Sequence, residues 1–276
     1  MEKPRINLVG CGRVARSLGR LWSSSGTLAI GGLYSRSASS ARSAAEFIGA
    51  GRPCDRLAEI GTADLWLIAT PDSALAVAAS ALAAEAPLRD GDCVFHCSGA
   101  CTSELLAPAR AAGAMTASAH PVLSFAVPEA ACRGFSGSHV GIEGELAAIA
   151  RLERVFTAIG ASCFTIDARH KMLYHAGSVF ASNFTVVLLD VALQCYRSAG
   201  IEPETAAALM RPLVEAAIGN ALRAGPAAAL SGPAARGDLE LVARQRQAVG
   251  DWAEDPGRAY EVLSRLAIEL AARAPR

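Results

Sequence analysis

The chain has 276 residues, of which 52% are hydrophobic and 19% charged, so it can bury a core without disulfides or a structural metal ion. Lys and Arg together number 26, and so do Asp and Glu. This neutral balance gives no electrostatic case for nucleic acid or an anionic membrane as the main partner. Lysine is nearly absent, since Lys3 and Lys171 are the only two and all other cations are Arg.

No targeting or membrane segment is expected. The most apolar stretch, 172–196, contains His175, Asn183 and Asp190, which argues against a membrane-spanning helix. The first five residues lead directly into an apolar run without the pattern of a secretory signal. We therefore expect a cytoplasmic protein.

The eight cysteines are scattered through predicted strands and helices, which in a cytoplasmic chain favours reduced thiols. The densest group is Cys93, His96, Cys97 and Cys101, and it contains no C-x-x-C pair. Cysteines at the end of an apolar strand are typically small buried hydrophobes, so no metal site is expected.

Short apolar runs alternate with alanine-rich helical stretches from residue 5 to about residue 167. This pattern predicts parallel strands joined by crossover helices. Strands are predicted at 6–9, 28–34, 65–69, 93–96, 115–119, 139–142 and 163–166. Helices are predicted between them at 14–23, 39–48, 73–84, 103–112 and 145–159, several of them beginning after a Ser. The fold class is therefore α/β, with a doubly wound, mostly parallel sheet.

The strand pattern ends after residue 167. Helices are predicted at 169–199, 203–223, 239–248 and 256–272, with a Gly- and Pro-rich stretch at 225–238. We therefore expect two domains, a sheet domain over 1–168 and an all-helical domain over 169–276.

A glycine motif follows the first predicted strand and opens the first helix. It reads Gly10, Cys11, Gly12, Arg13, Val14, Ala15, which is G-x-G-x-x-A in the context of a dinucleotide site. Gly10 permits the tight turn, and Gly12 lets the backbone approach a pyrophosphate at the helix N-terminus. The alternative is a turn that only links the strand to the helix.

The second strand ends in Ser35, Arg36 and Ser37, where an NAD site would place an acidic residue for the ribose hydroxyls. A guanidinium flanked by two hydroxyls suits a 2′-phosphate, which favours NADP. The alternative is that Arg36 is an ordinary solvated side chain.

Two further strand ends point to the same crevice, because ligands bind outside the carboxyl ends of such strands. The first carries Thr70, Pro71 and Asp72, and Asp72 suits a helix cap better than a catalytic acid. The second carries Ser98 and Gly99, a hydroxyl and an approachable backbone at the expected nicotinamide end. Nucleophilic serine chemistry is not expected, because the G-x-S-x-G pattern is absent.

Polar residues form a stripe along the predicted helix 169–199. Lys171, His175, Ser178 and Ser182 are spaced i, i+4, i+7 and i+11, so they share one helix face that could line a cleft. A lysine or histidine supplies the charge and the proton that a carbonyl needs when it receives a hydride. The alternative is a solvent-facing side, although such a face more often carries Glu and Arg.

Two other residues could belong to the functional site or have an ordinary structural role. His120 follows a predicted strand and either reaches the cleft or ends the strand. Arg236 lies in the glycine-bracketed stretch 230–238 and either closes on an anionic substrate or belongs to a plain connection.

The order of these motifs resembles a known family. G-C-G-R-V-A, Y-S-R-S, A-T-P-D, H-C-S-G-A, A-H-P, K-M-L-Y-H-A-G-S-V-F-A-S-N and S-G-P-A-A-R-G-D together look like Rossmann-like proteins with the domain of unknown function 2520. These are similar to pyrroline-5-carboxylate reductase, ketopantoate reductase and the wider 6-phosphogluconate-dehydrogenase-like group.

The resemblance implies an N-terminal NADP domain and a homodimer built through the C-terminal helices. In the wider group a helix lysine with a polar partner four residues on serves the reacting carbonyl, and Lys171 with His175 matches that spacing. The partner is commonly Asn, so with His175 in its place the resemblance leaves open which of the two residues delivers the proton. Asn183 matches the Asn of the S-N pair in the family's helix. The resemblance places it in the cleft region and implies no more specific role.

The expected activity is NADP-dependent reduction of a small oxo acid or a related carbonyl or imine. Lys171 is expected to donate the proton, His175 to assist it and Ser98 to position the substrate. The expected substrate-binding residues are Gly99, His120, Ser178, Asn183 and Arg236. The alternative class is a non-catalytic NADP-binding sensor, and a methyltransferase is disfavoured by the Ser35–Arg36–Ser37 strand end.

Overall fold

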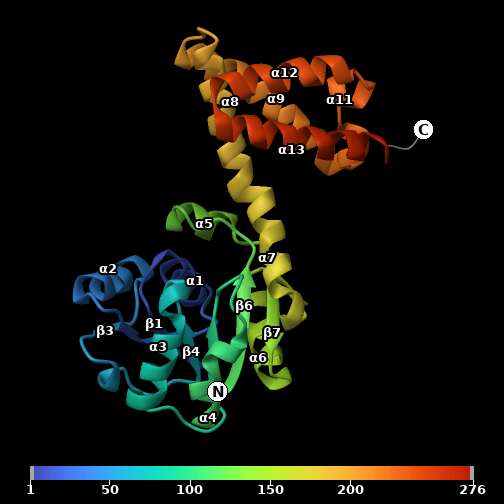
Figure 1. Cartoon of the computed structure of the whole chain (residues 1–276). Helices are drawn as coiled ribbons and strands as arrows, with labels where there is room; N and C mark the ends of the chain where they lie inside the picture. Colours follow the sequence, from blue (N-terminus) through green and yellow to red (C-terminus); the bar gives the residue numbers. More distant parts are fainter. Residues whose placement is uncertain (1–2, 274–276) are drawn as a thin grey trace. The chain divides into compact units, whose positions relative to one another are not determined.

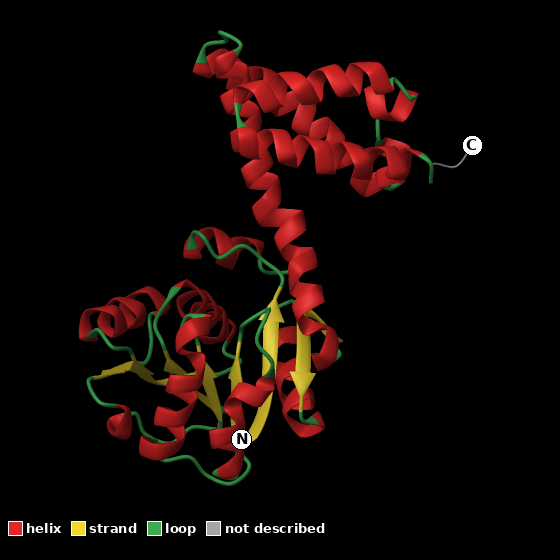
Figure 2. Ribbon diagram, viewed as in Figure 1, coloured by secondary structure: helices red, strands yellow, loops and turns green. Residues whose placement is uncertain are grey.

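The computed structural model describes residues 3–273 and divides into two compact units, Met1–Val179 and Phe180–Arg276. Within the described residues, all strands lie in the first unit and the second unit contains helices (Figure 2). The predicted α/β fold with a helical C-terminal region is confirmed.

The first unit is built on an eight-stranded sheet in the order β3-β2-β1-β4-β5-β6-β7-β8 (Figure 1). Its strands are β1 (Arg5–Val9), β2 (Ala29–Tyr34), β3 (Arg52–Cys54), β4 (Leu65–Ile68), β5 (Cys93–His96), β6 (Met115–Pro121), β7 (His139–Gly144) and β8 (Ser162–Thr165). Every pairing is parallel except that of β6 with β7. The carboxyl ends of β1, β4, β5 and β6 therefore meet at one edge, where a doubly wound sheet binds its ligands.

Helices cover both faces of this sheet. They are α1 (Arg13–Ser25), α2 (Ala38–Ile48), α3 (Asp72–Glu85), α4 (Ala107–Ala111), α5 (Pro128–Gly134), α6 (Leu146–Thr157) and α7 (Lys171–Val179), with 3₁₀ turns η1 (Leu57–Glu59), η2 (Ser103–Leu106) and η3 (Ala168–His170). Strand residues alternate between two hydrophobic clusters, as Leu65 and Leu67 do against Trp66 and Ile68. The first cluster holds α1, α2 and α6, and the second holds η1, α3 and α4.

Three features of this unit differ from the sequence pattern. The short strand β3 contains Pro53, which lowers its strand signal, and it pairs only with β2 at the sheet edge. Helix α5 lies in a stretch where no helix was predicted. The run 103–112 is divided into η2, which ends at Leu106, and α4, which begins at Ala107 and has Pro108 in its first turn.

Helix α7 belongs to the first unit rather than to the helical one. The domain boundary predicted at 168 precedes this helix, whereas the chain divides into its two compact units after Val179. The physical reason lies at its first residue, because Lys171 is completely buried and pairs with Glu143 of β7.

The second unit contains α8 (Thr185–Ser198), α9 (Pro203–Ala224), α10 (Pro226–Ala229), α11 (Pro233–Arg236), α12 (Leu239–Trp252) and α13 (Glu254–Ala271). The stretch 225–238 thus holds two short helices between its glycines. Ala206 and Gly257 are the only buried residues among positions 180–273. Such a unit has little core of its own.

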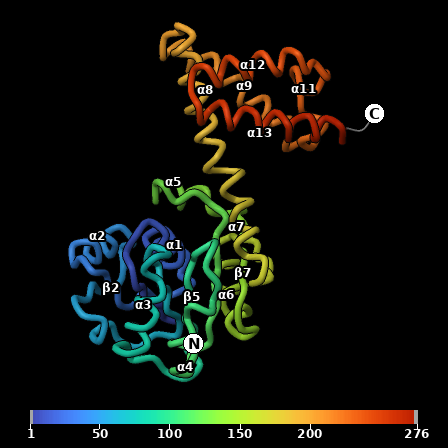
Figure 3. Tube along the Cα trace, in the orientation of Figure 1, coloured from blue at the N-terminus to red at the C-terminus, as the bar shows by residue number. Residues whose placement is uncertain are grey.

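Helix α7 passes through a π-helical segment, Phe180–Phe184, into α8 (Figure 3). Ser182 lies in this segment, so the wider helical turn breaks the i+11 register expected from Lys171. By length and composition alone, Ala168–Ser198 could cross a membrane. Its buried ion pair with the sheet shows instead that the first part of this helix packs against protein.

Candidate functional site

A cavity of about 750 Å³ opens at the carboxyl ends of β1, β2 and β4. Gly10 has φ of +93°, and a Cβ there would lie 2.7 Å from the Ala69 carbonyl group, so the turn requires glycine. A Cβ at Gly12 would meet only the Ala69 oxygen, at 3.9 Å, which leaves the space above the turn open. Gly12 is also the N-cap of α1, which has no side-chain cap and no acid in its first turn. The free N–H groups of this helix start suit a phosphate.

One side of the cavity is basic. Ser35, Arg36 and Ser40 line it together with Arg13 and Arg16, and no Asp or Glu is among the lining residues. The Arg16 Nε donates to the Cys11 carbonyl at 3.1 Å, which fixes that guanidinium beside the glycine turn. Arg16 and Ser40 were not predicted, although each lies close in sequence to a residue that was.

Most of the predicted cofactor residues line this cavity. They are Gly10, Cys11, Gly12, Arg13, Ser35, Arg36, Thr70 and Pro71. Cys11 contributes backbone only, because its thiol faces the Tyr34 carbonyl and burial raises its pKa to about 11.

The remaining four predicted cofactor residues do not line the cavity. Val14 packs on the core, and Ser37 precedes α2 with its hydroxyl 2.6 Å from that of Ser39. Asp72 and Ser98 bond to each other instead, with the Ser98 hydroxyl donating to Asp72 Oδ2 at 2.9 Å. These two side chains connect the cavity to the next strand end.

An unsatisfied polar atom supports a polar ligand in the cavity. The Thr70 hydroxyl lines it, is buried, and has no hydrogen-bond partner. Buried hydroxyls are rarely left unpaired, so a bound group that offers a partner fits this position. The open glycine turn, the uncapped helix and the basic rim thus suit a dinucleotide.

Ser98 is held in a tight turn after β5. Besides donating to Asp72, its oxygen accepts from the N–H groups of Ala100 at 3.2 Å and Cys101 at 2.9 Å. The Ser98 N–H donates to His96 Nδ1 at 3.2 Å, and burial lowers the pKa of His96 to about 4. The hydroxyl already has three hydrogen-bond partners. Its role in this structure is therefore to hold the turn that contains Gly99.

Lys171 lies in a buried network rather than on an open face. Its Nζ lies 2.8 Å from Glu143 Oε1 and donates to the Ser118 hydroxyl as well. Glu143 also accepts from the Ser103 N–H at 2.8 Å and from the Ser103 hydroxyl at 2.7 Å. Burial lowers the pKa of Lys171, and Glu143 opposes that shift. The network ties the start of α7 to β6, β7 and η2.

Two histidines lie directly beside Gly99, and Tyr174 contacts one of them. His120 Nδ1 lies 2.8 Å from the Tyr174 hydroxyl, and the rings of His120 and His175 stand edge to face with centroids 5.6 Å apart. A Cβ at Gly99 would collide with His175 Nδ1 and come within 2.9 Å of His120 Nε2. The structure therefore brings Gly99, His120 and His175 together, as the sequence predicted. Tyr174 was missed, although it sits in the same K-M-L-Y-H run.

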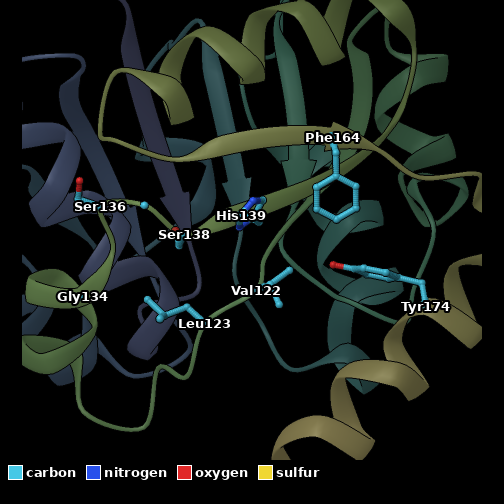
Figure 4. Close-up of a pocket in the computed structure, with 9 residues that line it drawn as sticks. Val122, Leu123, Gly134, Ser136, Ser138, His139, Phe164 and Tyr174 are labelled. Atoms are coloured by element: carbon cyan, nitrogen blue, oxygen red, sulfur yellow. The ribbon is translucent and has the colours of Figure 1, made fainter. Parts of the chain in front are cut away.

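A second cavity, of about 520 Å³, adjoins this group through Tyr174 (Figure 4). Its lining residues are Val122, Leu123, Gly134, Ser136, Gly137, Ser138, His139, Phe164 and Tyr174. In Figure 4 the Tyr174 hydroxyl points inward between Phe164 and Val122. The first cavity lies at the carboxyl ends of β1, β2 and β4, and the second lies where β6 ends and β7 begins.

Three predicted substrate residues are not part of this group. Ser178 is half-buried further along α7, whereas Asn183 and Arg236 lie in the second unit, in the π-helical segment and at the end of α11. Their roles stay predictions. Within residues 3–273 no three His, Cys, Asp or Glu side chains are grouped to hold a metal ion, and all eight cysteines are free.

Two protein-family models match the chain, one in its N-terminal part and one in its C-terminal part. Residues 1–121 match the Rossmann-like domain, and residues 138–267 match the domain of unknown function DUF2520. The chain combines these two domains. The resemblance predicted from the motifs is thereby confirmed, and no curated protein sequence matches the chain.

Solved structures share this arrangement over the whole chain. Protein TM1727 from Thermotoga maritima is 26% identical, with a TM-score of 0.75 over 97% of this chain and 98% of that chain. Protein BF3122 from Bacteroides fragilis, provisionally named an NADP oxidoreductase, is 22% identical, with a TM-score of 0.78 over 97% and 98%. An imine reductase from Myxococcus stipitatus in complex with NADP⁺ is 15% identical, with a TM-score of 0.67 over 96% and 94%. At such identities the last two establish a shared fold.

Proposed function

We propose that this Rossmann–DUF2520 protein is an NADP-dependent oxidoreductase that reduces a small oxo acid or a related carbonyl or imine compound. The supporting observation is the basic cavity at the glycine turn, together with the Asp72–Ser98 hydrogen bond, which joins the neighbouring strand end to the turn at Gly99. A fold shared with NADP-linked reductases agrees with this assignment.

Different residues of the chain would bind the cofactor, position the reacting group and supply charge in such a reaction. The bound dinucleotide supplies a hydride. The glycine turn and the start of α1 hold its pyrophosphate, and Arg36 with Ser35 binds the 2′-phosphate. Gly99 lets the rings of His120 and His175 pack directly against the turn, because a Cβ there would clash with them. The buried Lys171 fixes α7 in place and contributes a positive charge behind these histidines.

The experiment that tests the activity is a substrate screen. Purified protein is mixed with NADPH and a panel of 2-oxo acids and cyclic imines, and the loss of NADPH absorbance is followed. Turnover of at least one class supports the reductase. NADPH binding without turnover across the panel contradicts it and favours the alternative, a sensor that binds NADP without catalysis.

The cofactor preference has its own test in Arg36→Ala. Loss of a charge-assisted contact to the 2′-phosphate is expected to raise the Kd for NADPH about 10- to 100-fold. The Kd for NADH should stay within about twofold. Isothermal titration gives both values, and Arg42→Ala serves as the matched control because Arg42 is exposed on α2 and does not line the cavity. Equal losses for NADPH and NADH would contradict the assignment.

We further propose that the protein is a cytoplasmic homodimer formed through its second unit. The free cysteines suit a reducing compartment. The near absence of buried residues between positions 180 and 273 leaves apolar helix surface that a second copy would cover.

A further inference from the structure

Lys171 was expected to deliver the proton, but its ammonium group is in the wrong place to do so. Its side chain is completely buried, and both of its recorded partners, Glu143 and Ser118, belong to the sheet. A substrate would have to displace a buried ion pair to reach it, and breaking such a pair costs several kcal/mol. A different group must meet the substrate.

The Tyr174 hydroxyl has the access that Lys171 lacks. It lines the 520 Å³ cavity, where Figure 4 shows it directed toward the interior beside Phe164. Its other neighbour is His120 Nδ1 at 2.8 Å. When Nδ1 carries the hydrogen, His120 donates to the phenolic oxygen and the Tyr174 O–H is free to point into the cavity.

The surroundings keep both groups in the protonation state that this role needs. Burial lowers the pKa of His120 to about 4, and the positive charge of Lys171 adds to that shift. Burial also raises the pKa of the Tyr174 hydroxyl. At neutral pH the pair is therefore a neutral imidazole beside a protonated phenol.

We propose that Tyr174, held by His120, is the proton donor of the reductase, and that the substrate occupies the cavity lined by Val122, Phe164 and Tyr174. This inference rests on the proposed function. The apolar wall of Val122, Leu123 and Phe164 suits a substrate with a branched or aromatic substituent. Lys171 is then a positioning residue, which holds α7 so that Tyr174 meets His120.

The reaction combines a hydride transfer with a proton transfer. The carbon of the C=N or C=O bond receives a hydride, and its π electrons move to the nitrogen or oxygen. That atom takes the proton of the Tyr174 hydroxyl. The tyrosinate regains a proton from His120 Nδ1 while His120 Nε2 takes one from water. One hydride and one proton are added to the substrate, and the dinucleotide is oxidised by two electrons.

A matched pair of substrates separates proton donation from a structural role. A neutral cyclic imine, assayed above its own pKa, needs a hydride and a proton, whereas its N-methyl iminium salt needs the hydride alone. Tyr174→Phe is expected to lower kcat for the imine about 100- to 10,000-fold and to leave kcat for the iminium within about threefold. The Kd for NADPH should not change.

The control is Tyr260→Phe, because Tyr260 is a hydrogen-bonded tyrosine of the second unit whose hydroxyl donates to Gln245 at 2.9 Å. It should leave both substrates unaffected. Equal losses for imine and iminium in Tyr174→Phe, or no loss for either, would overturn the inference. If only oxo acids react, a Tyr174→Phe variant that keeps more than about a tenth of kcat overturns it. A wild type that reduces nothing in the panel overturns the proposed function itself, and the inference with it.

Discussion

Two histidines, one buried and one half-buried, make the stability of the sheet unit sensitive to acid. Burial lowers the pKa values of His96 and His120 to about 4, whereas histidine in an unfolded chain titrates near pH 6.5. Between these values the unfolded chain binds protons that the native protein does not. The free energy of unfolding therefore falls as the pH drops from about 6.5 to about 4, and these two groups add no further loss below that range.

The size of this effect is at most about 1.4 kcal/mol per pH unit for each histidine. Urea denaturation of the wild type and of His120→Asn at several pH values would measure it, and the variant should show a shallower slope by about one proton. The exposed His139 provides the control, since His139→Asn should keep the wild-type slope. A variant of His120 with an unchanged slope would contradict the expectation.

At the scale of elements, the Lys171–Glu143 pair decides whether α7 stays on the sheet. Both side chains are almost fully buried, and Lys171→Met would leave the Glu143 carboxylate without its cation. We expect the free energy of unfolding to fall by about 3–5 kcal/mol. The double variant Lys171→Met with Glu143→Gln should recover much of the loss, because a neutral Gln can still accept from Ser103.

Urea denaturation of the single and double variants tests this coupling. Arg169→Met is the matched control, because the neighbouring Arg169–Asp167 pair is exposed and should contribute little. Equal unfolding midpoints for the wild type and Lys171→Met would show that the pair does not hold α7.

The sequence predicted the elements that follow from periodicity and turn chemistry. Seven of the eight strands, the glycine turn and most of the flanking helices were found because each depends on residues close together in the chain. Strand β3 was missed because its three residues, one of them proline, gain strand structure only from pairing with β2. Helix α5 was missed because no helical pattern was recognised there.

The site was predictable only in part, for the same reason. The sequence singled out Lys171 as the unusual cation but gave no sign of Glu143, its partner across the fold. A long polar side chain on a helix face has the same pattern whether it meets a substrate or a buried carboxylate. Tyr174 was overlooked because a tyrosine beside Met and Leu has the pattern of a core residue.

For the whole molecule, the second unit raises the question of what stabilises it. Its helices expose many large apolar side chains, while its buried positions number two in the described part of the chain. The exposed residues include Phe180, Val186, Val187, Leu209, Leu213, Ile218, Leu222, Leu239, Val262, Leu263 and Leu266. A homodimer would bury this surface.

Charged substitutions on α9 test the dimer. Leu209→Glu with Leu213→Glu places two carboxylates on neighbouring turns of one face, and we expect a monomer by light scattering after gel filtration. The Kd for NADPH should stay unchanged, because the residues that line the dinucleotide cavity belong to the first unit. Arg211→Gln, an exposed change on the same helix, should leave the dimer intact. A wild type that is already monomeric contradicts the proposal.

The scarcity of lysine gives this protein a chemical reporter of its own. Of its two ε-amino groups, that of Lys3 is exposed and that of Lys171 is completely buried. An amine-reactive reagent can modify Lys171 only in molecules whose α7 has left the sheet. The rate of that modification, read by mass spectrometry on the unaltered chain, therefore measures how often this part of the native fold opens, and ligands that close the site should slow it.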